Sequence, residues 1–324
     1  MSRVVNFSKW LTESNEPNKT PGLSKSVVDW LYRCSSKTWS INASTGKIDV
    51  DGDFVSTRRN SLGFRGVNFG VIKGRFVIND AGLTSLEGAP KKVGGDFHCY
   101  NNELTSLEGA PQVVGGNFYC SANNLTSLEG APKKVGRNFI CNNNKLTSLK
   151  GAPKKVDGHF YCSNNELTSL EGAPQVVNGY FNCSTNKLTS LEGAPQAVGV
   201  DFNCSDNELT SLKGAPKKVN GGFYCNNNKL TSLEGAPQVV GGSFHCDEFK
   251  SDKWNMEEWL KILGDGASLI LTILPEAEID LWMKKRPLDI ALLDALPEIK
   301  KGVIQRTGIK DLSTLSRNLR GGII

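Results

Sequence analysis

Cysteine and histidine are the residues of this 324-residue chain whose spacing invites a chemical interpretation. Eight of the nine cysteines recur every 21 residues, at Cys99, Cys120, Cys141, Cys162, Cys183, Cys204, Cys225 and Cys246. Eight thiols could hold metal ions or form disulfides, but no Cys-x-x-Cys pair occurs, and a chain of this length can build its own apolar core. We therefore predict a column of buried, reduced thiols that act as small apolar side chains, with metal binding and disulfides as the alternatives.

The other residue types do not assemble into a catalytic constellation. The histidines, His98, His159 and His245, lie about three and four periods apart, too far to share a site on a repetitive fold. The sequence has no Gly-rich phosphate loop and no cluster with metal-ligand spacing. Cys34 stands outside the column in a predicted helix, where a buried or incidental thiol is favoured over a nucleophile. We expect a protein that is not an enzyme and uses neither cofactor nor metal.

The elements that position these residues are written in a 21-residue repeat. It reads Leu-Thr-Ser-Leu, Gly-Ala-Pro, Val and Phe-x-Cys and occurs eight times between residues 83 and 250, with an Asn after the Cys in all but the last copy. Such a period predicts a solenoid in which each coil buries its apolar face against its neighbours. Phe118 and Cys120 alternate with polar residues, so they face inward from a short strand. The recurring Asn, as at Asn123, is expected to hydrogen-bond the backbone at the turn that follows.

The spacing Phe-x-Cys-x-x-Asn-x-Leu resembles that of leucine-rich repeats, with Phe and Cys in two leucine positions. Leu-x-x-Leu and Gly-Ala-Pro resemble the short bacterial subtype, in which an extended, proline-marked segment forms the convex side, although each coil here carries one extra residue. The resemblance implies an α/β solenoid of about ten parallel coils with helical caps. Bacterial ubiquitin-ligase effectors join such repeats to a helical domain with a catalytic cysteine, but no cysteine follows Cys246 here.

Three segments are expected. Residues 1–82 form an N-terminal cap with helices at 6–13 and 23–34 and two divergent coils within 47–82, residues 83–250 form the eight repeats, and residues 251–324 form a helical C-terminal cap or small domain. The net charge of +5 lies entirely in residues 1–82. Its cluster, Arg58, Arg59, Arg65, Lys73 and Arg75, has no pattern of interleaved aromatic stacking, so a solvated edge is favoured over nucleic-acid binding.

Location and origin are inferred from composition and resemblance. The sequence has no apolar run long enough to span a membrane and no signal-peptide core in its first 20 residues, and unpaired thiols favour the cytoplasm. The repeat as a whole resembles uncharacterised repeat proteins of large tailed phages. The segment from Phe7 to Glu13 resembles the starts of phage virion and internal head proteins, although an ordinary docking helix is the favoured interpretation. These resemblances imply a viral source, with a host-cell cytoplasmic or virion location.

The repeats also predict a binding surface, because positions required by the fold are constant and the others vary. The most variable columns flank each Phe on the outward side of its strand. They are expected to form a concave, uncharged, amphipathic face that binds a partner protein, or, alternatively, to be tolerated surface residues. The predicted contact residues are Tyr119, Ile140, Tyr161, Tyr180, His98, Tyr224 and His245. The competing prediction is a structural or packaged virion protein docked by its N-terminal helix.

Overall fold

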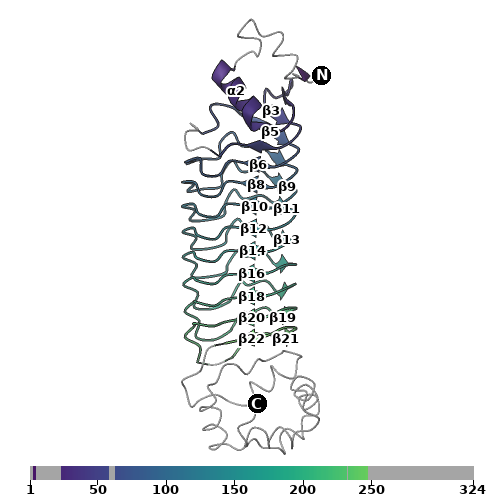
Figure 1. The fold of residues 1–324 in the computed structure, drawn as a ribbon. Helices are drawn as coiled ribbons and strands as arrows, with labels where there is room; N and C mark the ends of the chain where they lie inside the picture. The colour runs from purple at the N-terminus through teal and green to yellow at the C-terminus, as the bar shows by residue number, and fades with distance from the viewer. Residues whose placement is uncertain (1–2, 5–22, 58–62, 232, 247–324) are drawn as a thin grey trace, which may run out of the picture.

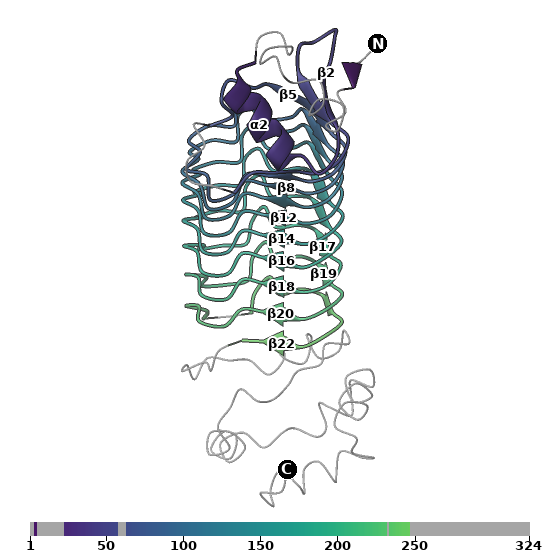
Figure 2. The same ribbon diagram turned by 45° about the horizontal axis from the view of Figure 1, so that its top comes forward.

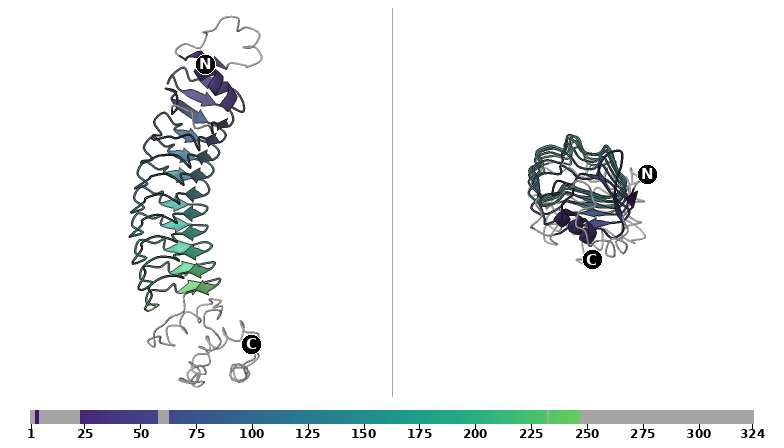
Figure 3. Two further views of the ribbon diagram at one scale, coloured as in Figure 1. Left: turned by 60° about the vertical axis from the view of Figure 1, so that its left-hand side comes forward. Right: turned by 90° about the horizontal axis from the view of Figure 1, so that it is seen from above.

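The computed structural model describes residues 3–4, 23–57, 63–231 and 233–246. These residues form a parallel β-solenoid of about nine turns, each of about 21 residues, close to the ten coils expected (Figure 1). The predicted helix at 6–13 and the predicted C-terminal cap at 251–324 lie outside the described residues. The stack bends gently along its length, and its coils superpose when it is seen from its end (Figure 3).

One side of every coil contributes a two-residue strand to a ten-stranded parallel sheet, here called the Phe sheet because each strand begins with Phe. Phe stacks on Phe from coil to coil in this sheet, with Phe118 opposite Phe139. Its strands are β4 (Phe54–Val55), β6 (Phe76–Val77), β8 (Phe97–His98), β10 (Phe118–Tyr119), β12 (Phe139–Ile140), β14 (Phe160–Tyr161), β16 (Phe181–Asn182), β18 (Phe202–Asn203), β20 (Phe223–Tyr224) and β22 (Phe244–His245).

A second side of the coils, here called the Val layer, carries the strands that end at the repeated Val. Its first sheet has seven strands: β1 (Arg3–Val4), β2 (Trp39–Ile41), β3 (Ile48–Val50), β5 (Phe69–Ile72), β7 (Lys92–Val93), β9 (Val113–Val114) and β11 (Lys134–Val135). Its second sheet has five strands: β13 (Lys155–Val156), β15 (Val176–Val177), β17 (Ala197–Val198), β19 (Lys218–Val219) and β21 (Val239–Val240). The layer is thus interrupted once, between β11 and β13.

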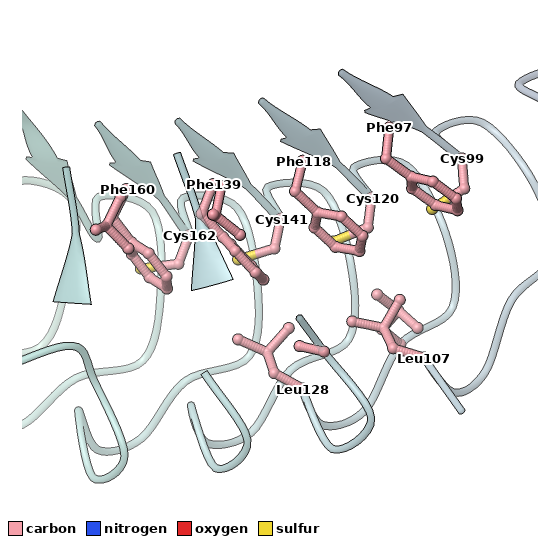
Figure 4. Close-up of a cluster of buried hydrophobic side chains, with 14 of the residues drawn as sticks. Phe97, Cys99, Leu107, Phe118, Cys120, Leu128, Phe139, Cys141, Phe160 and Cys162 are labelled. Atoms are coloured by element: carbon pink, nitrogen blue, oxygen red, sulfur yellow. The ribbon is translucent and has the colours of Figure 1, made fainter. Parts of the chain in front are cut away.

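The core runs the length of the stack as columns of like residues. The inward Phe rings lie face to face, with centroids 5.1 to 5.5 Å apart from Phe76 to Phe244. The Cys side chains lie beside them and point toward Leu107 and Leu128 on the far wall of the coil (Figure 4). Burial of the same apolar surface in every coil is the main stabilising contribution.

The first coils are covered by α2 (Lys25–Cys34), which falls within the helix predicted at 23–34 (Figure 2). Its buried face includes Val28, Trp30 and Leu31, and the Trp30 ring packs edge-on against Phe54 with centroids 5.2 Å apart. The strands β2 and β3 pair antiparallel, and β3 then pairs with β5 in parallel. A short antiparallel ribbon and α2 therefore lie over the first coils, where no neighbouring repeat is available.

The α/β expectation for the coils needs a correction, because the described repeats contain strands and turns without helix. The segment that would have to be helical carries Gly-Ala-Pro, and its glycine has φ between 85° and 91° in all eight repeats. A left-handed residue followed by proline cannot continue a right-handed helix. Among the described residues α2 is the only helix, and the wall opposite the Phe sheet is extended chain.

The predicted Asn column is confirmed as an internal ladder. Asn123 Oδ1 accepts a bond from the Leu104 N–H in the preceding coil, and its Nδ2 donates to the Cys99, Cys120 and Ser121 carbonyls. The same pattern repeats at Asn144, Asn165, Asn186, Asn207 and Asn228. Each amide joins two coils and satisfies backbone groups that no strand partner reaches.

Candidate partner-binding face

The outward side of the Phe sheet, here called the outer face, contains every residue predicted to contact a partner. The residue after each Phe forms one column on it, and the residue before each Phe forms another. Strand register places Tyr119 opposite His98 and Ile140, and Ile140 opposite Tyr161. Four predicted residues, from His98 to Tyr161, thus form an unbroken row on adjacent strands, each half-buried.

The predicted residues fall into two groups. His98 stacks on Tyr119 with centroids 4.4 Å apart, and Tyr161 meets Tyr180 edge-on at 5.5 Å. Tyr224 and His245 stack at 4.8 Å farther along the sheet. Asn182 and Asn203, in the same column, separate the two groups. The larger group, His98, Tyr119, Ile140, Tyr161 and Tyr180, is called the aromatic row.

Two further residues belong to this face. Tyr100 lies 5.9 Å from His98, and His159 lies 5.8 Å from Tyr161, measured between ring centroids. Tyr100 follows Cys99, at a position that holds small polar residues in most repeats, so variability among the repeats does not single it out. The signal that could have identified it is that Tyr100 is the one aromatic residue in this column.

The column before each Phe has a structural role that sequence comparison did not reveal. The side chains of Asp96, Asn117, Asn138, His159 and Asp201 each accept a hydrogen bond from the backbone N–H of the next coil, as Asn117 does from Asn138 at 3.0 Å and Asn138 from His159 at 2.8 Å. His159 does so through Nδ1, which accepts from the Tyr180 N–H at 2.8 Å. Asp, Asn and His all supply such an acceptor, so the variation in this column follows a requirement of the fold.

The outer face carries little charge. Burial raises the pKa of the Tyr119 and Tyr180 hydroxyls, which keeps them neutral. Burial also lowers the pKa of His98, an effect that Asp96, 3.9 Å away, opposes only in part. Neutral rings with a few hydrogen-bonding groups form an amphipathic surface, which suits a protein partner better than a small charged ligand.

We expect the stability of the fold to depend on pH through His98. Because its folded pKa lies below the unfolded value of about 6.5, the unfolded chain binds the proton more readily. The free energy of unfolding therefore falls as the pH drops below about 6.5 and levels off once the pH passes the folded pKa. The wild type should lose more stability over this range than His98→Asn, which lacks the titrating group and carries the residue that occupies this column at 182 and 203. Parallel curves across this range would contradict the assignment.

The cysteine column is inert in this structure. Its eight thiols form no disulfides and are at most 1% exposed, and burial raises the pKa of Cys120, Cys141, Cys162 and Cys204 well above the usual value. Several thiols point at the next coil, as Cys141 Sγ does at the Tyr161 carbonyl, 3.2 Å away. A protonated, inaccessible thiol is a poor nucleophile. Within the described ranges, no three His, Cys, Asp or Glu residues gather as a metal site.

The predicted basic cluster near the first coils is engaged within the chain where it is described. Lys73 pairs with Asp51 at 2.5 Å, Arg75 pairs with Asp53 at 3.0 Å, and the Arg65 guanidinium lies 5.5 Å from the centre of the Trp30 ring. Arg58 and Arg59 lie outside the described residues. The described members thus have counter-charges or a ring to pack on, which supports the solvated-edge interpretation.

Known proteins were compared with the chain in three ways. No protein-family model, curated protein or solved structure matches it. Within the ranges that the structure describes, no helix has the length and apolar character that a membrane span requires.

Proposed function

We propose that this protein is a non-enzymatic scaffold that binds a partner protein through the aromatic row. The observation that carries the proposal is the continuity of that row, in which four half-buried side chains stand on successive strands and the last of them, Tyr161, meets Tyr180. Aromatic side chains provide large contact areas at low entropic cost, and they are frequent among the residues that dominate binding energy.

The sheet beneath the row supports this proposal because it holds the row in place before binding. The Asn ladder, the Phe stack and the hydrogen bonds of the column before each Phe fix every strand against its neighbours. A preorganised surface loses little conformational entropy on association. The exposed ion pairs, such as Lys187–Glu166 and Lys229–Glu208, lie between adjacent coils and offer alternating charges to solvent.

The setting is also a proposal. The repeat spacing resembles leucine-rich repeats of phage-encoded proteins, and free, buried cysteines suit a reducing compartment such as the host cytoplasm. The alternative is a virion or packaged accessory protein, supported by the resemblance of residues 7–13 to the starts of phage head proteins. Fractionation of purified virions distinguishes the two settings. A packaged protein copurifies with the virion, and it should no longer do so when residues 1–13 are deleted.

The proposal predicts that light-induced cross-linking from the aromatic row captures the partner. Benzoylphenylalanine in place of Tyr161 should give a cross-linked protein, whereas the same group at Thr147, which is exposed elsewhere on the coil, should not. Once the partner is purified, Tyr161→Asn should weaken binding by about 1 to 2 kcal/mol, or roughly fivefold to thirtyfold.

Asparagine is the matched substitution because it stands in this column at 182 and 203 without disturbing the sheet. Tyr224→Asn, in the second aromatic group, is the positional control and should change the affinity less than twofold. Equal affinities for wild type and Tyr161→Asn, or cross-linking from Thr147 alone, would refute the proposal.

A further inference from the structure

A concentration of positive charge lies at one place beside the aromatic row. Residues 125–166 hold seven Lys or Arg residues against three Asp or Glu residues, although the charges of the whole repeat region nearly balance. Five of the seven lie on or within two residues of β11 and β13 and are all exposed, and we call them the basic corner: Lys133, Lys134, Arg137, Lys154 and Lys155.

The lysines of the basic corner are stacked in a way that the other repeats avoid. Lys-Lys also precedes the Val strand at 91–92 and 217–218, but the coils beside those pairs carry Gln-Val or Gln-Ala. Only here do two Lys-Lys coils follow each other, so Lys134 and Lys155 take neighbouring places. Like charges on adjacent strands are destabilising. The Val layer is interrupted at this step, where β11 ends one sheet and β13 begins the next.

Most of these charges have no counter-charge. Lys155 pairs with Asp157 at 2.7 Å, whereas Lys133, Lys134, Arg137 and Lys154 form no ion pair with any residue that the structure describes. At 209–229 the equivalent lysines, Lys217 and Lys218, also form no ion pair with any described residue, while Lys213 pairs with Glu234 and Lys229 with Glu208, each at 3.1 Å. The basic corner differs from that coil because it stacks two Lys-Lys coils and adds Arg137.

Arg137 connects the basic corner to the aromatic row. Its position holds Gly at 95, 116, 158, 179, 221 and 242, and Val at 200, so arginine is an exception that the turn does not require. Arg137 lies in the turn between β11 and β12, immediately before Asn138, and Ile140 at the end of β12 stands at the centre of the row. A ligand on Ile140 would therefore have guanidinium and ammonium groups at its border.

We propose that the basic corner binds a short acidic segment of the partner protein whose apolar residues cover the aromatic row. This inference rests on the proposed function and specifies the partner as one with carboxylates beside an apolar patch. The corner is two coils wide and flanked by uncharged Gln-Val coils at 112–113 and 175–176. That size suits a few carboxylates better than a polynucleotide, which would need a longer basic track.

The test uses variants of the full chain whose new residues are taken from neighbouring coils. K133Q/K134V/R137G installs the residues found at 112, 113 and 116, and K217Q/K218V/K229N removes the same positive charge elsewhere with residues found at 112, 113 and 124. The probes are a fluorescein-labelled oligoglutamate peptide and a thymidine oligonucleotide of equal charge, titrated at low ionic strength. Melting temperatures confirm that both variants fold.

We expect K133Q/K134V/R137G to weaken peptide binding about tenfold and K217Q/K218V/K229N to change it less than twofold. Equal losses in both variants, or no peptide binding by the wild type, would overturn the proposal. So would tighter oligonucleotide binding with the same dependence on the basic corner. If the corner fails this test while Tyr161→Asn still weakens the partner, only this inference is lost and the aromatic row remains the binding site.

Discussion

Replacing Gly151 with alanine is expected to destabilise the solenoid by about 2 to 5 kcal/mol. Gly151 has φ of 91°, and a Cβ there would lie 2.3 Å from the carbonyl carbon and oxygen of Leu128 in the preceding coil. A left-handed conformation costs an L-residue about 1 to 2 kcal/mol, and overpacking against a neighbour costs about 1 to 3 kcal/mol more. The neighbour here is backbone, which cannot rotate away. Denaturant unfolding followed by circular dichroism measures the loss.

Gly82→Ala provides the control for this substitution. Gly82 also has a left-handed backbone, with φ of 66°, but a Cβ there would have nothing within 4 Å. Only the left-handed conformation is then unfavourable, and we expect a loss of about 1 to 2 kcal/mol. An equal loss in both variants would show that the backbone conformation, and not the close approach to Leu128, accounts for the effect at Gly151.

Asn144→Asp is expected to have an effect of similar size for an electrostatic reason. The Asn144 Nδ2 group donates to the carbonyls of Cys120 and Cys141, both at 3.1 Å, and the side chain is buried. A carboxylate would face these oxygens without a donor. An uncompensated buried charge costs roughly 3 to 5 kcal/mol, so the free energy of unfolding should fall by about that amount at neutral pH.

The pH dependence of this variant identifies the cause. Burial raises the folded pKa of the introduced carboxyl, so the folded state binds the proton more tightly than the unfolded chain. Stability should therefore recover as the pH falls toward about 4 and decline as it rises. Asn143→Asp is the control, because Asn143 is exposed and aspartate takes the equivalent left-handed position at 80 and 206. If both variants lose the same stability, the ladder does not carry the proposed role.

Much of the architecture follows from the repeat itself. Phe118 and Cys120 alternate with polar neighbours, so their inward direction is a local property of a strand. The amide of Asn123 has to serve backbone groups at the turn, and its four hydrogen bonds match that expectation. The wall carrying Gly-Ala-Pro follows the same logic, because left-handed glycine and proline exclude the helix that an α/β solenoid would need.

The outer face could be located from the sequence, but the different roles of its two columns could not be recognised. Variability selected Tyr161 and Tyr180 together, and the two rings do meet. It could not separate the column of Asn138 and His159, which hydrogen-bonds the next coil, from the column of Ile140, which does not. Both columns vary, and the first does so because several residue types supply the same acceptor atom.

The sequence by itself determined the period, the inward columns and the amide ladder, because each is set by residues within one coil and then repeated. Only the tertiary structure decided which aromatic rings touch, where the Val layer is interrupted and which lysines lack partners. These features depend on how side chains about 21 residues apart meet across the stack, as Lys213 and Glu234 do. The physical reason is that alternation and turn chemistry act along the chain, whereas contacts between coils depend on the spacing and register that packing imposes.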